Sequence, residues 1–183
     1  PASELKKLGI DLRLDSKGVG KNLHDHPAAQ IHLTSKNSGY GISWRTLPGL
    51  AIEPFKYLFG KGLLSSVTVE SGGFARTSPT ISEPDVQFHF IPARMGHEGR
   101  MIVWGQGYNV SVCVLNPTSK GSLTLKSADP ADGLVIDFNL LATDFDRQTM
   151  LNGFKLMRRL LAAPSFDGIR DKEVFPGADI ATD

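Results

Sequence analysis

The feature that most constrains the fold of this chain is a change in the spacing of its apolar residues. Apolar and polar side chains alternate strictly within residues 84–90, and further short runs rich in β-branched residues follow up to residue 138. From residue 143 the apolar side chains recur at helical spacing. Strands followed by a long helix predict an α+β fold, a mainly antiparallel β-sheet with helices on one side.

The run 84–90 is the clearest expected strand, because its two faces differ in polarity. Val86, Phe88 and Phe90 lie on one face, and Asp85, Gln87 and His89 lie on the other. Residues 108–115 and 122–126 flank the turn-forming run Asn116–Gly121, so we expect them to form an antiparallel hairpin. Another short strand is expected at 134–138.

The first half of the chain predicts shorter elements. Residues 3–8 form an expected helix capped by Ser3, and residues 10–14 and 28–34 are expected to be extended. Pro54 within the helical run 47–59 predicts a kink or two shorter helices. Gly72 and Gly73 interrupt the β-rich run 67–75, which predicts a bulge.

The long C-terminal helix is expected to begin at Thr143 or Asp144, either of which can cap it, and to end near Ala163. One apolar stripe runs along it, formed by Met150, Leu151, Phe154, Met157, Leu160 and Leu161. The stripe gives the helix a face to bury against the sheet.

Composition and charge exclude several classes of protein. With 40% hydrophobic and 21% charged residues and a net charge of +1, nothing favours nucleic acid as a partner. No run of about 18 apolar residues occurs, so no membrane span is predicted. The single cysteine, Cys113, is expected to be a buried, inert thiol and fits a reducing compartment. We expect a cytoplasmic location, with attachment to the inner-membrane surface left open for a longer protein.

Histidines are the main candidates for chemistry. The metal-ligand candidates are His24, Asp25, His26 and His32. The H-D-H run resembles part of a ligand set, but no strong partner set accompanies it, so hydrogen-bonded loop residues are the preferred interpretation and no metal is predicted. His89 is either a partly exposed sheet residue or a pocket histidine that exchanges protons near neutral pH. The sequence contains neither a G-x-S-x-G elbow nor a G-x-G-x-x-G dinucleotide fingerprint.

Several segments together resemble one family. Gly18-Val19-Gly20-Lys21-Asn22-Leu23-His24-Asp25-His26-Pro27 closely resembles the G-V-G-x-N-L-x-D-H-P segment of the glucose–methanol–choline (GMC) family of FAD-dependent oxidoreductases. Further segments resemble motifs of its choline and aliphatic-alcohol dehydrogenase branch, in the same order: 70–74, 84–90, 116–123, 135–140 and 175–177. Their number, order and spacing make a chance match implausible.

The resemblance implies a piece of a longer enzyme that oxidises an alcohol CH–OH to a carbonyl, with hydride transfer to FAD. Residues 1–27 would be the tail of the FAD domain and its junction, and residues 28–183 a substrate-binding domain truncated at its C-terminus. The family's catalytic histidine, in an H-P-x-G-T segment, is absent from these residues. We therefore expect no catalytic residue here, no activity from this chain alone, and the FAD domain of the same polypeptide as its partner.

The resemblance also assigns site residues. His89 matches a position facing the substrate pocket, and Met95 matches a pocket-lining position more loosely. Asn22, Asp25 and His26 match the junction segment, where they contact the cofactor or serve a structural role. Choline-oxidising members tend to have Glu where this chain has Ala28, so the resemblance favours a neutral alcohol over choline.

Two alternatives to a piece of a dehydrogenase remain open. One is a stand-alone, non-catalytic binding module derived from the same family. The other is a metal-dependent enzyme that uses the histidine run. For a piece of a dehydrogenase, a sheet cut from its FAD domain would expose an apolar face and promote self-association.

Overall fold

The computed structural model describes residues 1–36, 41–67, 69, 71–94, 96, 103–180 and 182. These residues divide into two compact units. One consists of residues 1–27 and 116–148, and the other of residues 28–115 and 149–183. The predicted division into an FAD-domain junction at 1–27 and a substrate domain at 28–183 concerns a longer protein and stays a prediction.

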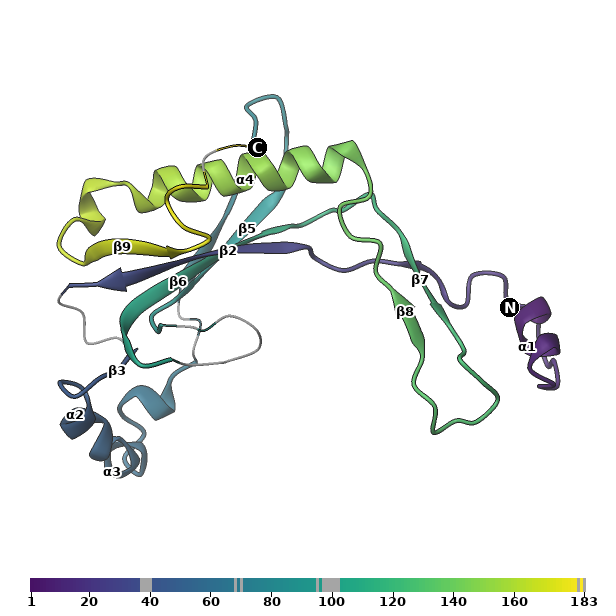
Figure 1. The fold of residues 1–183 in the computed structure, drawn as a ribbon, viewed down its shortest axis with the longest axis horizontal. Coiled ribbons are helices and arrows are strands. Elements are labelled where there is room, and N and C mark those ends of the chain that lie inside the picture. The colour runs from purple at the N-terminus through teal and green to yellow at the C-terminus, as the bar shows by residue number, and fades with distance from the viewer. Residues whose placement is uncertain are drawn as a thin grey trace. The chain divides into compact units, whose positions relative to one another are not determined.

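The larger unit is built on a six-stranded sheet whose strands pair antiparallel (Figure 1). Its main path runs in the order β4-β5-β6-β2-β9, and β3 pairs with one end of β6. The strands are β2 (Ala28–Ser35), β3 (Gly41–Ile42), β4 (Ser71–Ala75), β5 (Val86–Ile91), β6 (Gly105–Val114) and β9 (Arg170–Phe175). The predicted mainly antiparallel α+β fold is therefore confirmed.

One face of this sheet is sealed by the long helix α4 (Asp144–Leu161), of which residues 149–161 belong to the larger unit. Gly153 permits close packing, since a Cβ there would lie 3.0 Å from side-chain atoms of Val112 and Val86. The fully buried core residues include Ile31, Val86, Tyr108, Val112 and Met157. The predicted apolar stripe thus supplies part of this core, and the short helix η2 (Pro164–Phe166) follows α4.

Two short helices and a 3-10 turn follow β3. They are α2 (Leu47–Ala51), α3 (Glu53–Tyr57) and η1 (Leu63–Ser65). Pro54 lies in the first turn of α3, where its missing N–H costs nothing, so the helical run divides into two helices as predicted. No helix formed by the described residues is long and apolar enough to cross a membrane.

The smaller unit contains a three-stranded antiparallel sheet in the order β1-β7-β8. Its strands are β1 (Lys21–Leu23), β7 (Gly121–Thr124) and β8 (Val135–Asp137), and its first helix is α1 (Ala2–Lys7). The helix is tied to the end of β7, because the Leu125 backbone N–H donates a 2.7 Å hydrogen bond to Glu4.

A buried carboxylate, that of Asp146, organises the loop that precedes β7. Asp146 is 0% exposed and accepts hydrogen bonds from the backbone N–H groups of Thr118 and Ser119, both at 2.8 Å, and from the Thr118 hydroxyl at 2.9 Å. Burial alone would raise the pKa of Asp146, but these hydrogen bonds outweigh it and lower the pKa to about 2. The first turn of α4 and the 118–119 loop are therefore joined through an ionised side chain.

The predicted hairpin between 108–115 and 122–126 is wrong. A strand has two edges for pairing, and those of β6 are occupied by β5 and β2. The strand β7 pairs instead with β1 and β8. The loop after β6 leads into a second sheet, which the local turn signal could not distinguish from a hairpin.

Three smaller predictions also fail. Residues 10–14 form no strand, and Ser3 lies inside α1, which begins after Pro1 without a side-chain cap. The strand β4 pairs with β5 residue by residue, so Gly72 and Gly73 form no bulge. Glycine is required at position 72 for a different reason, because a Cβ there would lie 2.3 Å from the Phe88 carbonyl oxygen.

Candidate functional site

The sheet face opposite α4 carries mostly polar side chains, and strand register brings them into rows. Residues directly opposite one another across strands share a face. One row contains Gln30, Ser111, His89 and Gly72, and the next contains Ala28, Cys113, Gln87 and Phe74. We call the face formed by Ala28, Gln30, His32, Gln87, His89, Asn109, Ser111 and Cys113 the polar face.

His89 lies at the centre of this face, half-buried in the middle of β5. Its partner directly opposite on β4 is Gly72, which has no side chain. On the β6 side the Cys113 sulfur lies 3.9 Å from His89 Nε2. Burial raises the pKa of the Cys113 thiol, which therefore keeps its proton and can donate a weak hydrogen bond to the imidazole.

A polar cluster formed by the buried His32 and Asn109 and the exposed Gln30 occupies the neighbouring part of the face. The Asn109 amide nitrogen donates to Gln30 Oε1 at 3.2 Å and lies 3.0 Å from His32 Nε2. His32 Nε2 in turn lies 3.0 Å from Gln30 Oε1, and the Phe175 ring packs against the imidazole at 5.1 Å between centroids. These contacts make His32 part of a hydrogen-bonded cluster within the sheet.

His24 and His26 lie outside any strand. The strand β1 ends at Leu23, so His24 and His26 are exposed side chains in the loop that follows. In the part of the chain that the structure describes, no three His, Cys, Asp or Glu side chains lie close enough together to hold a metal ion.

The predicted junction residues Asn22, Asp25 and His26 are also exposed. The Asp25 carboxylate accepts a 2.8 Å hydrogen bond from the His26 backbone N–H, and Asn22 has a left-handed backbone with φ 58°. An amide at the middle of β1 and a carboxylate and an imidazole on the loop that follows are groups that can contact the polar parts of a flavin nucleotide. Their assignment to cofactor binding stays a prediction, and Met95, the second predicted substrate residue, lies outside the described residues.

Gly18 and Gly20, which precede this loop, differ in how well they could accommodate a side chain. Gly20 has φ +73°, and a Cβ there would lie 2.3 Å from the Leu123 carbonyl oxygen. We expect Gly20→Ala to lower the free energy of unfolding by about 2 kcal/mol, because both the backbone and the contact with β7 must shift. Gly18→Ala is the matched control, since a Cβ at position 18 would meet no atom within 4 Å beyond its chain neighbours. Equal stability of the two variants in chemical denaturation would contradict this account.

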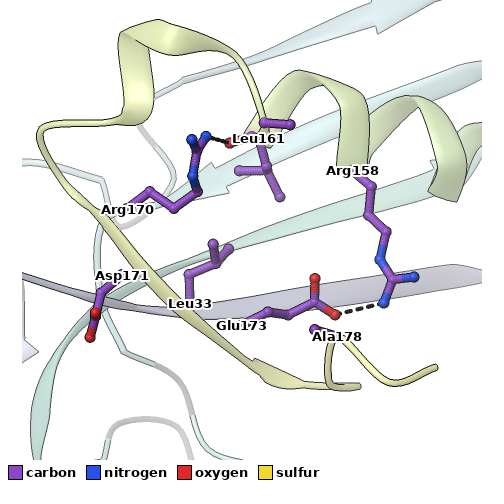
Figure 2. A pocket seen from close by; sticks show the side chains of 8 residues that line it. Leu33, Arg158, Leu161, Arg170, Asp171, Glu173 and Ala178 are labelled. Carbon is purple, nitrogen blue, oxygen red and sulfur yellow. Dashed lines mark hydrogen bonds and ion pairs between the residues drawn. The ribbon is translucent and has the colours of Figure 1, made fainter. Parts of the chain in front are cut away.

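A polar pocket of about 400 Å³ lies on the α4 side of the sheet (Figure 2). Arg158 pairs with Glu173 at 2.7 Å, and Arg170 donates to the Leu161 carbonyl oxygen at the end of α4. Both guanidinium groups thus tie β9 to the helix. Their charges are balanced by nearby carboxylates, so we interpret the pocket as a structural junction.

A second, largely apolar groove of about 450 Å³ runs between the edge strand β4 and the C-terminal half of α4. Phe88, Phe90 and Leu160 are among its lining residues. Neither this groove nor the polar pocket includes His89, because both lie on the helix side of the sheet and His89 faces away from it.

Sequence reasoning did not identify Gln30, Asn109 and Cys113 as members of the face that carries His89. A signal for Gln30 was present, since alternation within 28–34 places Ala28, Gln30 and His32 on one face. The partners of that face, Asn109 and Cys113, become visible only with the register between β2 and β6.

Known proteins are similar in sequence to this chain over its whole length. The family model described as GMC oxidoreductase matches residues 117–183. The chain is 39% identical to an alcohol dehydrogenase (acceptor) of Pseudomonas putida, of which it covers 33%. It is 33% identical to an oxygen-dependent choline dehydrogenase of Rhizobium meliloti (strain 1021), of which it covers 34%. The chain therefore spans about a third of the length of the curated relatives it matches.

Solved structures of oxidases are also similar to this chain. A crystal structure of formate oxidase matches 97% of the chain at 26% identity with a TM-score of 0.80, and the chain covers 36% of it. Pyridoxine 4-oxidase from Mesorbium loti matches 97% of the chain with a TM-score of 0.73, over 31% of its own length. At 20% identity, the second likeness shows the fold alone.

Proposed function

Because this chain belongs to the GMC oxidoreductase family, we propose that it is the substrate-domain part of a longer FAD-dependent dehydrogenase that oxidises an alcohol to a carbonyl. The observation that carries the proposal is the asymmetry of the six-stranded sheet. Its apolar face is sealed by α4, and its polar face presents His89 beside hydrogen-bonding side chains. Of the two faces, the polar one has the chemistry to hold a hydroxyl group.

Each role proposed for this chain concerns binding and orientation. Bound FAD would supply the acceptor for the hydride that leaves the carbinol carbon. His89 would exchange a hydrogen bond with the alcohol hydroxyl, and the Cys113 thiol would hold the imidazole in place. Ser111 lies beside His89 in the same row and adds a hydroxyl partner. The base that takes the hydroxyl proton lies outside these residues.

A neutral alcohol is the substrate class that the polar face supports. Ala28 and its neighbours across the sheet, Cys113 and Gln87, carry no charge at neutral pH. A quaternary ammonium group placed there would lack a counter-charge, and its desolvation would go uncompensated. We therefore propose a neutral aliphatic or aromatic alcohol.

Adding the missing charge tests this substrate class. In the full-length protein we expect Ala28→Glu to improve kcat/KM for choline at least about tenfold, because the carboxylate supplies a counter-charge for the ammonium group. The same variant should use neutral alcohols less well. Ala28→Gln matches the added bulk without the charge. Similar choline kinetics for the two variants would rule out the electrostatic explanation.

The proposed activity itself is tested with the full-length protein loaded with FAD. We expect it to reduce a redox dye when supplied with a primary or secondary alcohol, whereas residues 1–183 alone should not. Failure of the loaded protein to oxidise any alcohol of a broad panel would contradict the proposed function. Turnover by the 183-residue chain would contradict the expectation that this chain lacks a catalytic residue.

A further inference from the structure

The side-chain amide of Gln30 is a hydrogen-bonding group of the polar face that the proposed roles do not use. Gln30 lies on β2 and is exposed, whereas the two residues that contact its amide, His32 and Asn109, are 2% and 1% exposed. The amide oxygen Oε1 accepts a hydrogen bond from the Asn109 amide nitrogen at 3.2 Å and lies 3.0 Å from His32 Nε2. Two buried side chains thus fix an exposed one, so Gln30 loses little freedom when it binds a further group.

The contacts of the amide oxygen determine which end of the Gln30 amide is available. A glutamine amide has one acceptor oxygen and an NH2 group with two N–H donors. Because Oε1 contacts Asn109 and His32, the NH2 group is the end left to bind another molecule. Within the part of the chain that the structure describes, this NH2 group makes no hydrogen bond. Gln30 therefore presents hydrogen-bond donors, and the group that it can recognise is an acceptor oxygen.

Strand register places Gln30 in line with His89. Gln30 lies opposite Ser111 on β6, and Ser111 lies opposite His89 on β5, so the three residues form one row on the polar face. Neighbouring strands are about 4.8 Å apart, which places the two ends of this row about 10 Å apart. Beyond His89 the row ends at Gly72 on β4, the last strand of the sheet that the structure describes. Polar side chains of this row therefore extend from His89 towards Ser111 and Gln30, and not towards β4.

From this row we propose that Gln30 is a specificity-determining residue, and that the substrate carries a second oxygen about 10 Å from the hydroxyl that is oxidised. The inference rests on the proposed contact between His89 and the reacting hydroxyl. The Gln30 NH2 group donates a hydrogen bond to the second oxygen, which belongs to an ether, a carbonyl or a further hydroxyl group. A plain alkanol of the same length leaves this donor without a partner in the complex and is therefore the poorer substrate. The substrate class is thus a neutral alcohol with a distant acceptor oxygen.

Two alcohols of equal length test this inference in the full-length protein loaded with FAD. In its extended form, 6-methoxyhexan-1-ol carries an ether oxygen about 9 Å from its hydroxyl oxygen, and 1-octanol has a CH2 group at the same place. We expect kcat/KM to be about tenfold higher for the ether, which is the effect of one net hydrogen bond. The shorter pair, 2-methoxyethanol and 1-butanol, should show no such preference, because its ether oxygen lies too close to the hydroxyl to reach Gln30.

Gln30→Glu shows whether Gln30 causes the preference. This variant keeps an oxygen that accepts from Asn109, but it replaces the NH2 donors by a second acceptor oxygen. The ratio of the two kcat/KM values, ether over alkanol, should therefore fall about tenfold. Gln87→Glu is the matched control, because it makes the same substitution on the polar face in the neighbouring row and should keep the preference for the ether.

The outcomes separate this inference from the proposed function. Equal kcat/KM values for the two long alcohols in the unmodified protein, or an unchanged ratio in Gln30→Glu, would overturn the inference and leave the proposed function intact. Loss of FAD from Gln30→Glu, or an equal fall in kcat/KM for both alcohols, would also overturn it, because the Gln30 amide would then contact the cofactor or another part of the protein. Failure of the unmodified protein to oxidise any alcohol would overturn the proposed function and this inference together.

Discussion

Replacing His89 by alanine in the full-length protein is expected to lower kcat/KM for its alcohol substrate by about 100-fold, while FAD content and thermal stability stay unchanged. The imidazole is the ionisable group at the centre of the polar face, and its removal leaves the hydroxyl of the substrate without that hydrogen-bond partner. Folding should be unaffected, because the side chain is half-buried on the face opposite the core. Steady-state kinetics with a dye acceptor measure the effect.

Two companion variants separate the chemistry of His89 from its bulk. His89→Gln keeps a hydrogen-bonding group near the position of Nε2, so we expect part of the lost rate to return. His24→Ala removes an exposed loop histidine and should retain the activity of the unmodified protein. An unchanged kcat/KM in His89→Ala would mean that the polar face does not contact the substrate.

The second large effect is expected at Asp146. Asp146→Ala should lower the free energy of unfolding by about 3 kcal/mol, since it leaves the backbone N–H groups of Thr118 and the buried Ser119 without their acceptor. Asp144→Ala, at a fully exposed position in the same helical turn, should cost less than about 1 kcal/mol. Denaturant titrations of both variants give the comparison, and equal losses would contradict the role assigned to Asp146.

The same carboxylate predicts how stability depends on pH. Its pKa in the folded protein, about 2, lies below the ordinary value for aspartate, so the folded state favours the ionised form. The resulting stabilisation is fully present above about pH 4 and is lost as the pH falls toward 2. In Asp146→Asn the stability should fall less steeply across this range. A variant with the same slope as the unmodified protein would show that another group dominates acid unfolding.

Local periodicity predicted the elements with the strongest apolar pattern, but not which strands pair with one another. Strict alternation in 84–90 predicted β5 and the face on which His89 lies, and the helical spacing after residue 143 predicted α4. The predicted pairing of β6 with β7 was wrong because the turn-forming residues 116–121 are equally compatible with a hairpin and with a connection to another sheet. The choice between them depends on long-range pairing, which spacing along the chain does not encode.

The residues of the candidate site also differ in whether the sequence alone could identify them. His89 could be proposed from its place in a motif, whereas the Cys113 sulfur beside it required the register of two neighbouring strands. Asp146 was overlooked because the sequence offered Thr143 and Asp144 as caps, and both fit a helix N-terminus. The special environment of Asp146 comes from the Thr118–Ser119 loop, which precedes it by more than 25 residues.

Anaerobic mixing of the FAD-loaded, full-length protein with a neutral primary alcohol tests the central claim most directly. In the absence of an electron acceptor, the reduction of the flavin by the alcohol is measured by itself. The account predicts that the alcohol bleaches the flavin absorbance, and that this step is about 100-fold slower in His89→Ala than in the unmodified protein. A flavin that stays oxidised, or one reduced at the same rate in both proteins, would contradict the assignment of the polar face to alcohol binding.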